Sequence, residues 1–177
     1  MKLQGQIAVI TGGGTGIGLG IAHAFAEAGC TVVIAGRREE PLALATAAWQ
    51  GNGSLVHHCV DVSNRDSVQV LFDWVQSEVG EIDILVNSAG TNIPNRTLAN
   101  MAPDQWDSVM AINASGAYYC MLAAVPGMRS RGEGLVINIS SISGVRATAL
   151  GGVAYSASKF AMAALGMAAS NEVNVDG

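Results

Sequence analysis

Short apolar runs alternate with longer stretches of helical periodicity along this chain, and this alternation constrains the fold more than any other feature of the sequence. The runs at residues 6–11, 31–35, 54–60, 82–86 and 135–139 read as buried strands. Strands that alternate with helices pair as parallel βαβ units with right-handed crossovers. The sequence therefore predicts an α/β fold, a doubly wound parallel sheet with helices on both faces.

Helical patterns fill the intervals between these strands. They are predicted at residues 17–28, 39–49, 103–128 and 153–174, with a further helix after Ser63, whose side chain is suited to the N-cap position. That further helix carries an apolar stripe at Val68, Leu71, Phe72, Val75 and Val79. Because no linker, repeat or low-complexity segment interrupts the pattern, residues 1–177 are expected to form a single domain with a substantial core.

Composition and charge exclude several other classes of protein. Half of the residues are hydrophobic and 13% are charged, so the chain is neither disordered nor a coiled coil. A net charge of −5, with no basic cluster beyond Arg37-Arg38, argues against a nucleic-acid surface. No apolar run reaches the length of about 18 residues that a membrane span requires, and residues 1–5 lack the architecture of a signal peptide. We therefore expect a cytoplasmic protein without nucleic-acid or membrane partners.

The cysteines and histidines form no recognisable framework. Cys30, Cys59 and Cys120 are isolated and odd in number, with no Cys-x-x-Cys spacing. They read as buried thiols in a reducing compartment, and not as a disulfide frame or a zinc site. The three histidines read as structural or surface residues, and no metal site is expected.

The turn between the first predicted strand and helix is rich in glycine, reading TGGGTGIG at residues 11–18. Glycines let the backbone turn tightly and approach a pyrophosphate, which then lies on the N–H groups at the helix N-terminus. A G-x-G-x-x-G pattern is weak evidence alone and can mark a plain turn. This one joins a strand to a helix at the start of a βα series, which favours a dinucleotide site.

The end of the second predicted strand bears on which dinucleotide binds. An acidic residue there would accept hydrogen bonds from the adenosine ribose and repel a 2′-phosphate. This chain has Gly36-Arg37-Arg38 instead, with no acid before Glu39. Arg37 is able to form bidentate, charge-assisted bonds to a phosphate, although both arginines could also simply be solvated at a helix start. The pattern favours NADP over NAD.

Near the end of the chain, Tyr155 and Lys159 are four residues apart, so they share one face of a helix. A phenol ionises only near pH 10 in water, and a neighbouring positive charge makes it a stronger acid. The pair is a weak signal alone, but Ser140-Ser141 lies just upstream and the glycine turn lies at the other end of the chain. Together these residues indicate a reductase site.

In these motifs and in their order, the chain resembles the short-chain dehydrogenases/reductases, in their compact single-domain branch. The family's glycine turn corresponds to residues 11–18, and its acidic residue after the third strand to Asp61, followed by Val62. The N-N-A-G motif appears at residues 87–90, where Ser88 replaces the usual asparagine. The resemblance runs from residue 3 to the last residue.

The resemblance implies roles for particular residues. The implied catalytic residues are Asn113, Ser141, Tyr155 and Lys159, with Ser140 as the alternative to Ser141. The expected cofactor-binding residues are Gly12, Thr15, Gly16, Ile17, Gly18, Arg37, Arg38, Asp61, Val62, Asn87, Ala89, Gly90, Tyr155 and Lys159.

The implied activity is hydride transfer between NADP(H) and a carbonyl or secondary alcohol. Tyr155 would protonate the alkoxide, Ser141 would steady that oxygen, and Lys159 would hold the nicotinamide ribose and assist Tyr155. Asn113 would hold a relay water through its backbone. The stretch 91–101, at the site entrance in the family, fits a sugar acid or polyol and a 3-oxoacyl thioester about equally.

The family continues past the Tyr/Lys helix with a sixth strand, a substrate loop and a seventh strand. We therefore expect this chain to lack the far-edge strands and the substrate-loop region, as a truncated or part-ordered chain. A non-catalytic dinucleotide-binding fragment is the alternative function. The resemblance also implies a homo-oligomer, dimer or tetramer, formed by the helices around Asn113 and Tyr155, with small and flexible apolar residues at Ala117, Tyr118, Met121, Ala161, Ala164 and Met167.

Overall fold

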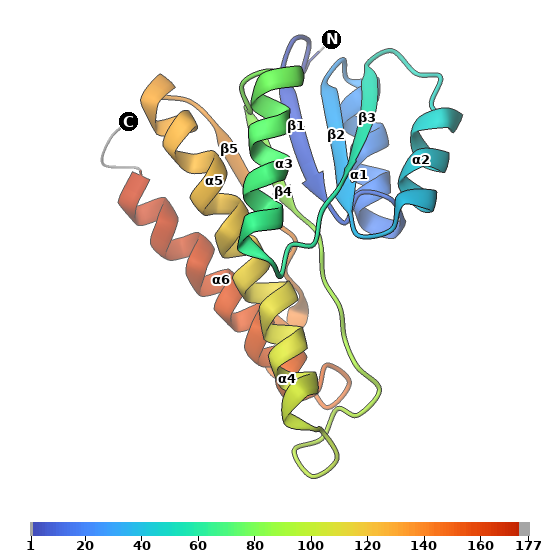
Figure 1. Ribbon diagram of the computed structural model, residues 1–177. Coiled ribbons are helices and arrows are strands. Elements are labelled where there is room, and N and C mark those ends of the chain that lie inside the picture. Colours follow the sequence, from blue (N-terminus) through green and yellow to red (C-terminus); the bar gives the residue numbers. More distant parts are fainter. Residues whose placement is uncertain (1, 174–177) are drawn as a thin grey trace.

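The central element of the computed structural model, which describes residues 2–173, is a five-stranded parallel sheet in the order β3-β2-β1-β4-β5 (Figure 1). The strands are β1 (Ile7–Thr11), β2 (Thr31–Gly36), β3 (Ser54–Cys59), β4 (Ile84–Asn87) and β5 (Leu135–Asn138). The chain moves outward from β1 to β3 and then returns to the other side of β1. The predicted doubly wound sheet is therefore confirmed, with a topological switch point between β1 and β4.

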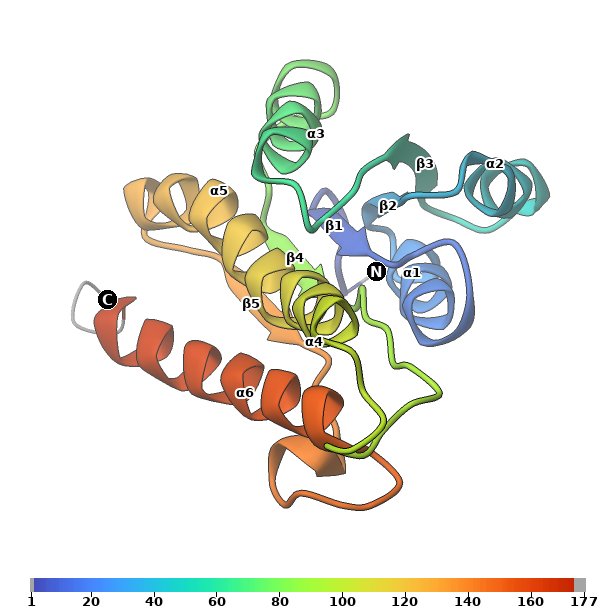
Figure 2. The same ribbon diagram turned by 60° about the horizontal axis from the view of Figure 1, so that its bottom comes forward.

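Helices cover both faces of the sheet (Figure 2). Helices α1 (Gly16–Glu27) and α2 (Glu39–Ala48) pack on one face, and α3 (Arg65–Glu78) and α5 (Gly116–Arg131) pack on the other. Helix α6 (Val153–Val173) lies beside α5, and its Leu165 and Ala169 pack against the same core cluster. Residue 174, the expected end of α6, lies outside the described residues.

Two apolar cores, one on each face, follow from the alternation of side chains along the strands. Val9, Val33 and Leu85 point toward α3 and α5, whereas Ile10 and Ile34 point toward α1 and α2. All five are fully buried, and burial of each such side chain stabilises the fold by about 1.5–3 kcal/mol. Near-continuous hydrophobic runs are required because the central strands are covered on both faces.

The predicted helix at residues 103–128 is a continuous helical stretch with a change of pitch inside it. Helix α4 (Pro103–Met110) passes into a π-helical segment, Ala111–Ser115, and then into α5. By length and composition the stretch from Pro103 to Arg131 could cross a membrane. Here it is a core helix, because Cys120 and Ala124 of α5 are buried against the sheet. Widened π turns of this kind often lie at functional sites.

Two local predictions are wrong. The N-cap of α3 is Asn64 and not Ser63: the Asn64 side chain accepts hydrogen bonds from the backbone N–H groups of Asp66 and Ser67, while Ser63 donates to Asp61. Cys59 is exposed and not buried, because the last residue of edge strand β3 faces Glu39, to which its thiol donates. Cys30 and Cys120 are buried as expected.

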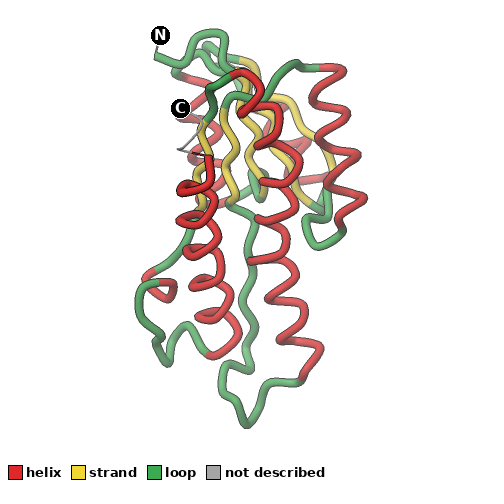
Figure 3. The backbone as a smooth tube through the Cα atoms, turned by 90° about the vertical axis from the view of Figure 1, so that its left-hand side faces the viewer, coloured by secondary structure: helices red, strands yellow, loops and turns green. Residues whose placement is uncertain are grey.

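Loops at the carboxyl ends of the strands extend well beyond the sheet (Figure 3). The β4–α4 loop and the β5–α6 loop meet there, joined by the hydrogen bonds from Asn92 Nδ2 to the Gly151 carbonyl and from Val153 N to the Arg96 carbonyl. Since ligands of open α/β sheets bind outside the carboxyl ends of the strands, these loops frame the expected position of a site.

Candidate active site

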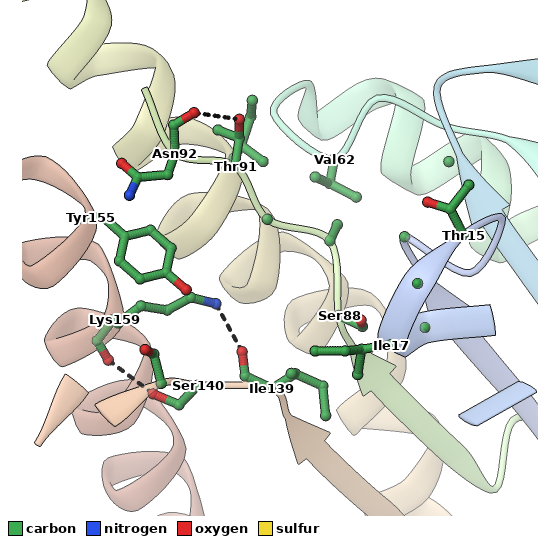
Figure 4. Close-up of a pocket in the computed structure, with 18 of the residues that line it drawn as sticks. Thr15, Ile17, Val62, Ser88, Thr91, Asn92, Ile139, Ser140, Tyr155 and Lys159 are labelled. Atoms are coloured by element: carbon green, nitrogen blue, oxygen red, sulfur yellow. Dashed lines mark hydrogen bonds between the residues drawn. The ribbon is translucent and has the colours of Figure 1, made fainter. Parts of the chain in front are cut away.

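A cavity of about 1040 Å³ lies outside the carboxyl ends of the strands, at the switch point between β1 and β4. Its walls come from the β1–α1 turn, the end of β2, the segments after β4 and β5, and the first turns of α6 (Figure 4). Of the sequence-predicted site residues, it brings together Gly12, Thr15, Gly16, Ile17, Gly18, Arg37, Arg38, Val62, Ala89, Gly90, Ser141, Tyr155 and Lys159.

The β1–α1 turn is fixed against the segment that follows β4. Gly12 has φ +67°, and a Cβ there would lie 2.9 Å from the Ala89 Cα and N atoms. The Thr11 hydroxyl oxygen accepts hydrogen bonds from the N–H groups of Ser88 and Ala89, each at 3.2 Å. Only glycine permits both this φ and this approach of two backbones. The turn and the 88–90 segment therefore form one continuous wall.

The N-terminus of α1 opens into the cavity. Its N-cap, Thr15, makes no side-chain capping hydrogen bond, so the first N–H groups of the helix remain available. Gly16 has φ +56°, and a Cβ placed there would meet no atom within 4 Å. A helix N-terminus with free N–H groups and open space over its first residue suits a pyrophosphate. The β1–α1 turn and the N-terminus of α1 together form a glycine cradle. This glycine cradle fits the dinucleotide that the glycine pattern predicts.

The walls at the end of β2 are cationic. Arg37 and Arg38 both line the cavity, and no aspartate or glutamate among the described residues does so. Asp61 lies near Arg37 but does not line the cavity. The Ser63 hydroxyl donates to its carboxylate and holds the pKa of Asp61 below its usual range, with a smaller contribution from Arg37. This region therefore presents guanidinium groups, and no free carboxylate, to a ligand.

Tyr155 and Lys159 face the cavity from α6 (Figure 4). The Lys159 ammonium donates to the Ile139 carbonyl at 2.8 Å and lies 5.7 Å from the centroid of the Tyr155 ring. Lys159 is 4% exposed, and this burial lowers the pKa of its ammonium. The ammonium also donates to the Met162 sulfur at 3.8 Å. Since an ammonium has three donors, one remains for a ligand.

The two serines after β5 have different surroundings. Ser141 caps a short 3₁₀ turn (Ile142–Gly144), and its hydroxyl oxygen accepts from the Ser143 N–H at 3.1 Å. Its own O–H hydrogen is therefore left for a ligand. Ser140 instead donates to the Lys159 carbonyl at 3.4 Å. Both line the cavity, but their hydrogen bonds favour Ser141 as the donor to a bound oxygen.

Asn113 lies in the π-helical segment and is fully buried, so it is not a surface asparagine of the helix. Its side-chain amide accepts from the Thr91 N–H at 2.7 Å and donates to the Thr91 carbonyl at 2.9 Å and to Ser158 Oγ at 3.0 Å. Asn113 does not line the cavity. Its side chain instead ties the β4–α4 loop to α6, which positions Tyr155 and Lys159 relative to the 88–90 segment.

Asn87 is the third predicted site residue, with Asp61 and Asn113, that the cavity lining does not include. It is 2% exposed, and its side-chain amide donates to Asn138 Oδ1 at 2.9 Å, joining the ends of β4 and β5. The polar groups of the lining that sequence reasoning did not name individually include Asn92, Arg96 and the Ile139 carbonyl. Arg96 had a signal, since it is the charged residue in the otherwise uncharged stretch 91–101.

Comparison with known proteins agrees with this geometry. The family model for short chain dehydrogenase matches residues 6–177, and the chain belongs to that family. A 3beta-hydroxysteroid dehydrogenase 2 of Eggerthella lenta is 41% identical over 92% of this chain, and a D-beta-hydroxybutyrate dehydrogenase of Cupriavidus necator is 36% identical over 83% of it.

These matches cover 63% and 57% of the two relatives, so the chain spans about six-tenths of their length. Among solved structures, a metagenomic short-chain oxidoreductase in complex with NADP superposes with a TM-score of 0.92 at 34% identity. That match covers 99% of this chain and 80% of the other.

Gly18→Ala is expected to damage the glycine turn, because the new Cβ would collide with the Gly12 carbonyl oxygen. The collision involves backbone on both sides, so we expect a loss of about 1–3 kcal/mol of unfolding free energy and loss of dinucleotide binding. Urea unfolding and nucleotide titration measure the two effects.

Gly20→Ala, two residues further along α1, is the matched control because a Cβ there meets nothing within 4 Å. It should leave binding intact and stabilise the chain by up to ~1 kcal/mol, the difference in helix propensity. Equal behaviour of the two variants would contradict the close packing of the turn.

Proposed function

We propose that this chain carries the cofactor site and the catalytic residues of an NADP-dependent reductase that interconverts a carbonyl and a secondary alcohol. The observation that carries the proposal is one cavity with a glycine cradle at one end and the Tyr155–Lys159 pair at the other. Both relatives named above are dehydrogenases of hydroxy compounds. Candidate substrates remain 3-oxoacyl thioesters and sugar acids or polyols.

Three observations support NADP over NAD. Arg37 and Arg38 line the cavity, no described carboxylate shares its wall, and a structural neighbour at 34% identity was solved with NADP. Arg37 provides a planar fork for a phosphate monoester. Thr15, Ile17 and the other residues of the β1–α1 turn would hold the pyrophosphate, and Asp61 and Val62 would border the adenine.

Each catalytic side chain is assigned one task in the proposed mechanism. The bound nicotinamide supplies the hydride in reduction and accepts it in oxidation. Tyr155 gives its phenolic proton to the substrate oxygen as charge develops there, and Ser141 donates a hydrogen bond to the same oxygen. Lys159 binds the nicotinamide ribose and stabilises the phenolate left on Tyr155. Asn113 positions α6 and supports a relay water through its backbone.

A second candidate function is a dinucleotide-binding fragment without turnover. The chain spans 63% and 57% of the length of the two relatives, so their activity does not transfer to it directly. The two functions differ in one measurement. Fluorescence titration with NADPH and NADH tests binding, and a carbonyl panel then tests turnover. Binding of a nucleotide without turnover of any carbonyl would support the second function.

Apolar residues on α5 and α6 support the proposal of a homo-oligomer. Tyr118 and Leu122 are 47% and 42% exposed on one face of α5, and Phe160 and Met167 are 43% and 64% exposed on α6. Two members of the expected interface set, Ala117 and Met121, are buried in the chain's own core instead.

The two buried thiols, Cys30 and Cys120, fit a reducing compartment such as the cytoplasm.

We expect light scattering at micromolar concentration to show a dimer or tetramer, because these side chains would be removed from water in the assembly. Tyr118→Lys with Met167→Lys should shift the mass toward the monomer. Val70→Lys, an exposed apolar position on α3, is the control and should leave the mass unchanged. A monodisperse monomer of the unmutated protein would rule out the oligomer.

Arg37→Asp should weaken NADPH binding far more than NADH binding, since it places a carboxylate against the 2′-phosphate. Loss of charge-assisted hydrogen bonds alone predicts a drop of roughly 10- to 100-fold in NADPH affinity. Fluorescence titration with both nucleotides measures the ratio. Arg65→Asp, an exposed position on α3, controls for net charge, and equal losses for both nucleotides would show that Arg37 does not read the phosphate.

Tyr155→Phe removes one oxygen and little volume, so the fold and NADPH binding should survive while kcat falls by about 10²–10⁴-fold. Lys159→Met keeps the side-chain length and removes the charge, and it should weaken NADPH binding as well as kcat. Steady-state kinetics and nucleotide titration of each variant separate the two roles. A near-normal kcat for Tyr155→Phe would disprove the mechanism.

A further inference from the structure

The cavity is cationic at both ends, although the chain as a whole has a net charge of −5. Its charged lining residues are Arg37, Arg38, Arg96 and Lys159, and no described carboxylate lines it. The proposed function uses Arg37, Arg38 and Lys159 for the cofactor. Arg96 has no role in that scheme, so its charge requires a separate explanation.

Arg96 lies at the Tyr155 end of the cavity. Its carbonyl accepts from the N–H of Val153, the first residue of α6 and two residues before Tyr155. The neighbouring Asn92 donates to the Gly151 carbonyl at 3.1 Å, and both Asn92 and Gly151 line the cavity. In Figure 4, Asn92 and Tyr155 lie next to each other on this side, away from Thr15 and Ile17 of the glycine turn. The backbone of Arg96 is therefore joined to the first turn of α6, at the end of the cavity that holds Tyr155.

The Arg96 side chain is held in place by the protein itself. Its Nε donates to the Ile93 carbonyl at 3.0 Å and its Nη1 to the Leu150 carbonyl at 2.5 Å. Gly152 has φ +78°, and a Cβ there would lie 2.5 Å from Arg96 Cβ, so only glycine allows this packing. The guanidinium is thus ordered before any ligand arrives, which reduces the entropy lost on binding.

These hydrogen bonds hold the Arg96 guanidinium in place but do not neutralise its charge. Two of the five guanidinium donors are used, both on neutral carbonyls. Within the described residues no ion pair joins Arg96 to a carboxylate, in contrast to Arg131, which pairs with Glu81 and Asp83. A half-buried cation without a counter-ion favours an anionic ligand, and a planar fork favours a carboxylate.

We infer that the carbonyl substrate is an oxo acid, whose carboxylate binds Arg96 while its carbonyl oxygen meets Tyr155 and Ser141. The inference rests on the proposed function and narrows its substrate class. Asn92 at the same rim keeps one amide N–H after its bond to the Gly151 carbonyl, and this N–H donates to the acid. The alternative is a structural role only, in which Arg96 joins the β4–α4 and β5–α6 loops and no ligand touches it.

Matched pairs of substrates separate these two roles. Acetoacetate and acetoacetamide, and 4-oxopentanoate and its primary amide, differ in charge but hardly in shape. For the unmutated protein we expect kcat/KM to be higher for each acid than for its amide. Arg96→Gln should lower kcat/KM for the acids by roughly 10- to 100-fold, mainly through KM, because a charge-assisted hydrogen bond is lost. The values for the amides should change little.

Two further variants complete the comparison. Arg96→Lys keeps the charge without the planar fork and should retain part of the preference for acids. Arg146→Gln removes the same charge from an exposed residue of the β5–α6 loop that does not line the cavity, and it should leave both substrate classes unchanged. Thermal unfolding of each variant identifies any that is misfolded, and Arg96→Lys then carries the test.

Equal losses for acids and amides in Arg96→Gln would overturn the inference and leave Arg96 as a loop clamp. Calorimetric titration of each oxo acid into the NADP-saturated chain keeps this outcome distinct from failure of the proposed function. Arg96-dependent binding of the acid without turnover of any carbonyl would contradict the reductase but support the anion site. Absence of both acid binding and acid turnover would overturn the inference.

Discussion

The close approach of two backbone turns at the β1–β4 switch point is the constraint on which the rest of the site depends. Gly12 packs against Ala89 at a distance that excludes a side chain, and the Thr11 hydroxyl holds the opposing N–H groups. This contact brings the free N-terminus of α1 and the 88–90 segment into one wall. With a wider separation, the glycine cradle and the Tyr155–Lys159 pair would no longer lie in one cavity, and a bound dinucleotide could not reach both.

Burial of a cation is the second requirement of the site. Lys159 is almost fully buried, and desolvation lowers the pKa of its ammonium, so the Ile139 carbonyl must compensate part of the lost hydration. A Cβ at Gly90 would lie 3.6 Å from Nζ and 3.5 Å from Asn113 Oδ1, so the segment that follows β4 packs at ordinary contact distance from both groups. The side chains of Asn113 and Lys159 thereby fix α6 against the segment that follows β4, and the Tyr155 ring is held beside the ammonium.

Much of the fold could be predicted because apolar periodicity reports burial directly. All of the expected strands form, and the expected helices form within a few residues of their predicted ends. Local competition was harder to predict. Ser63 and Asn64 are both good N-cap residues, and the choice depends on Asp61, which engages the Ser63 hydroxyl and leaves Asn64 to cap α3. In the same way, Cys59 is exposed because β3 is the edge strand, a property of strand order and not of local sequence.

The sequence by itself determined the class of fold, the glycine cradle, the cationic end of β2 and the Tyr155–Lys159 pair, because each depends on residue types at fixed local spacing. Tertiary structure alone decided that Asn113 is buried and hydrogen-bonded to Ser158 of α6. It also decided that Ser140 donates to the Lys159 carbonyl of α6, whereas Ser141 keeps its hydroxyl hydrogen for a ligand. It further decided that Arg96 lines the cavity at the end that holds Tyr155, with no ion pair to a carboxylate among residues 2–173. These outcomes join residues separated by tens of positions, and no local pattern specifies which of the available polar groups will meet.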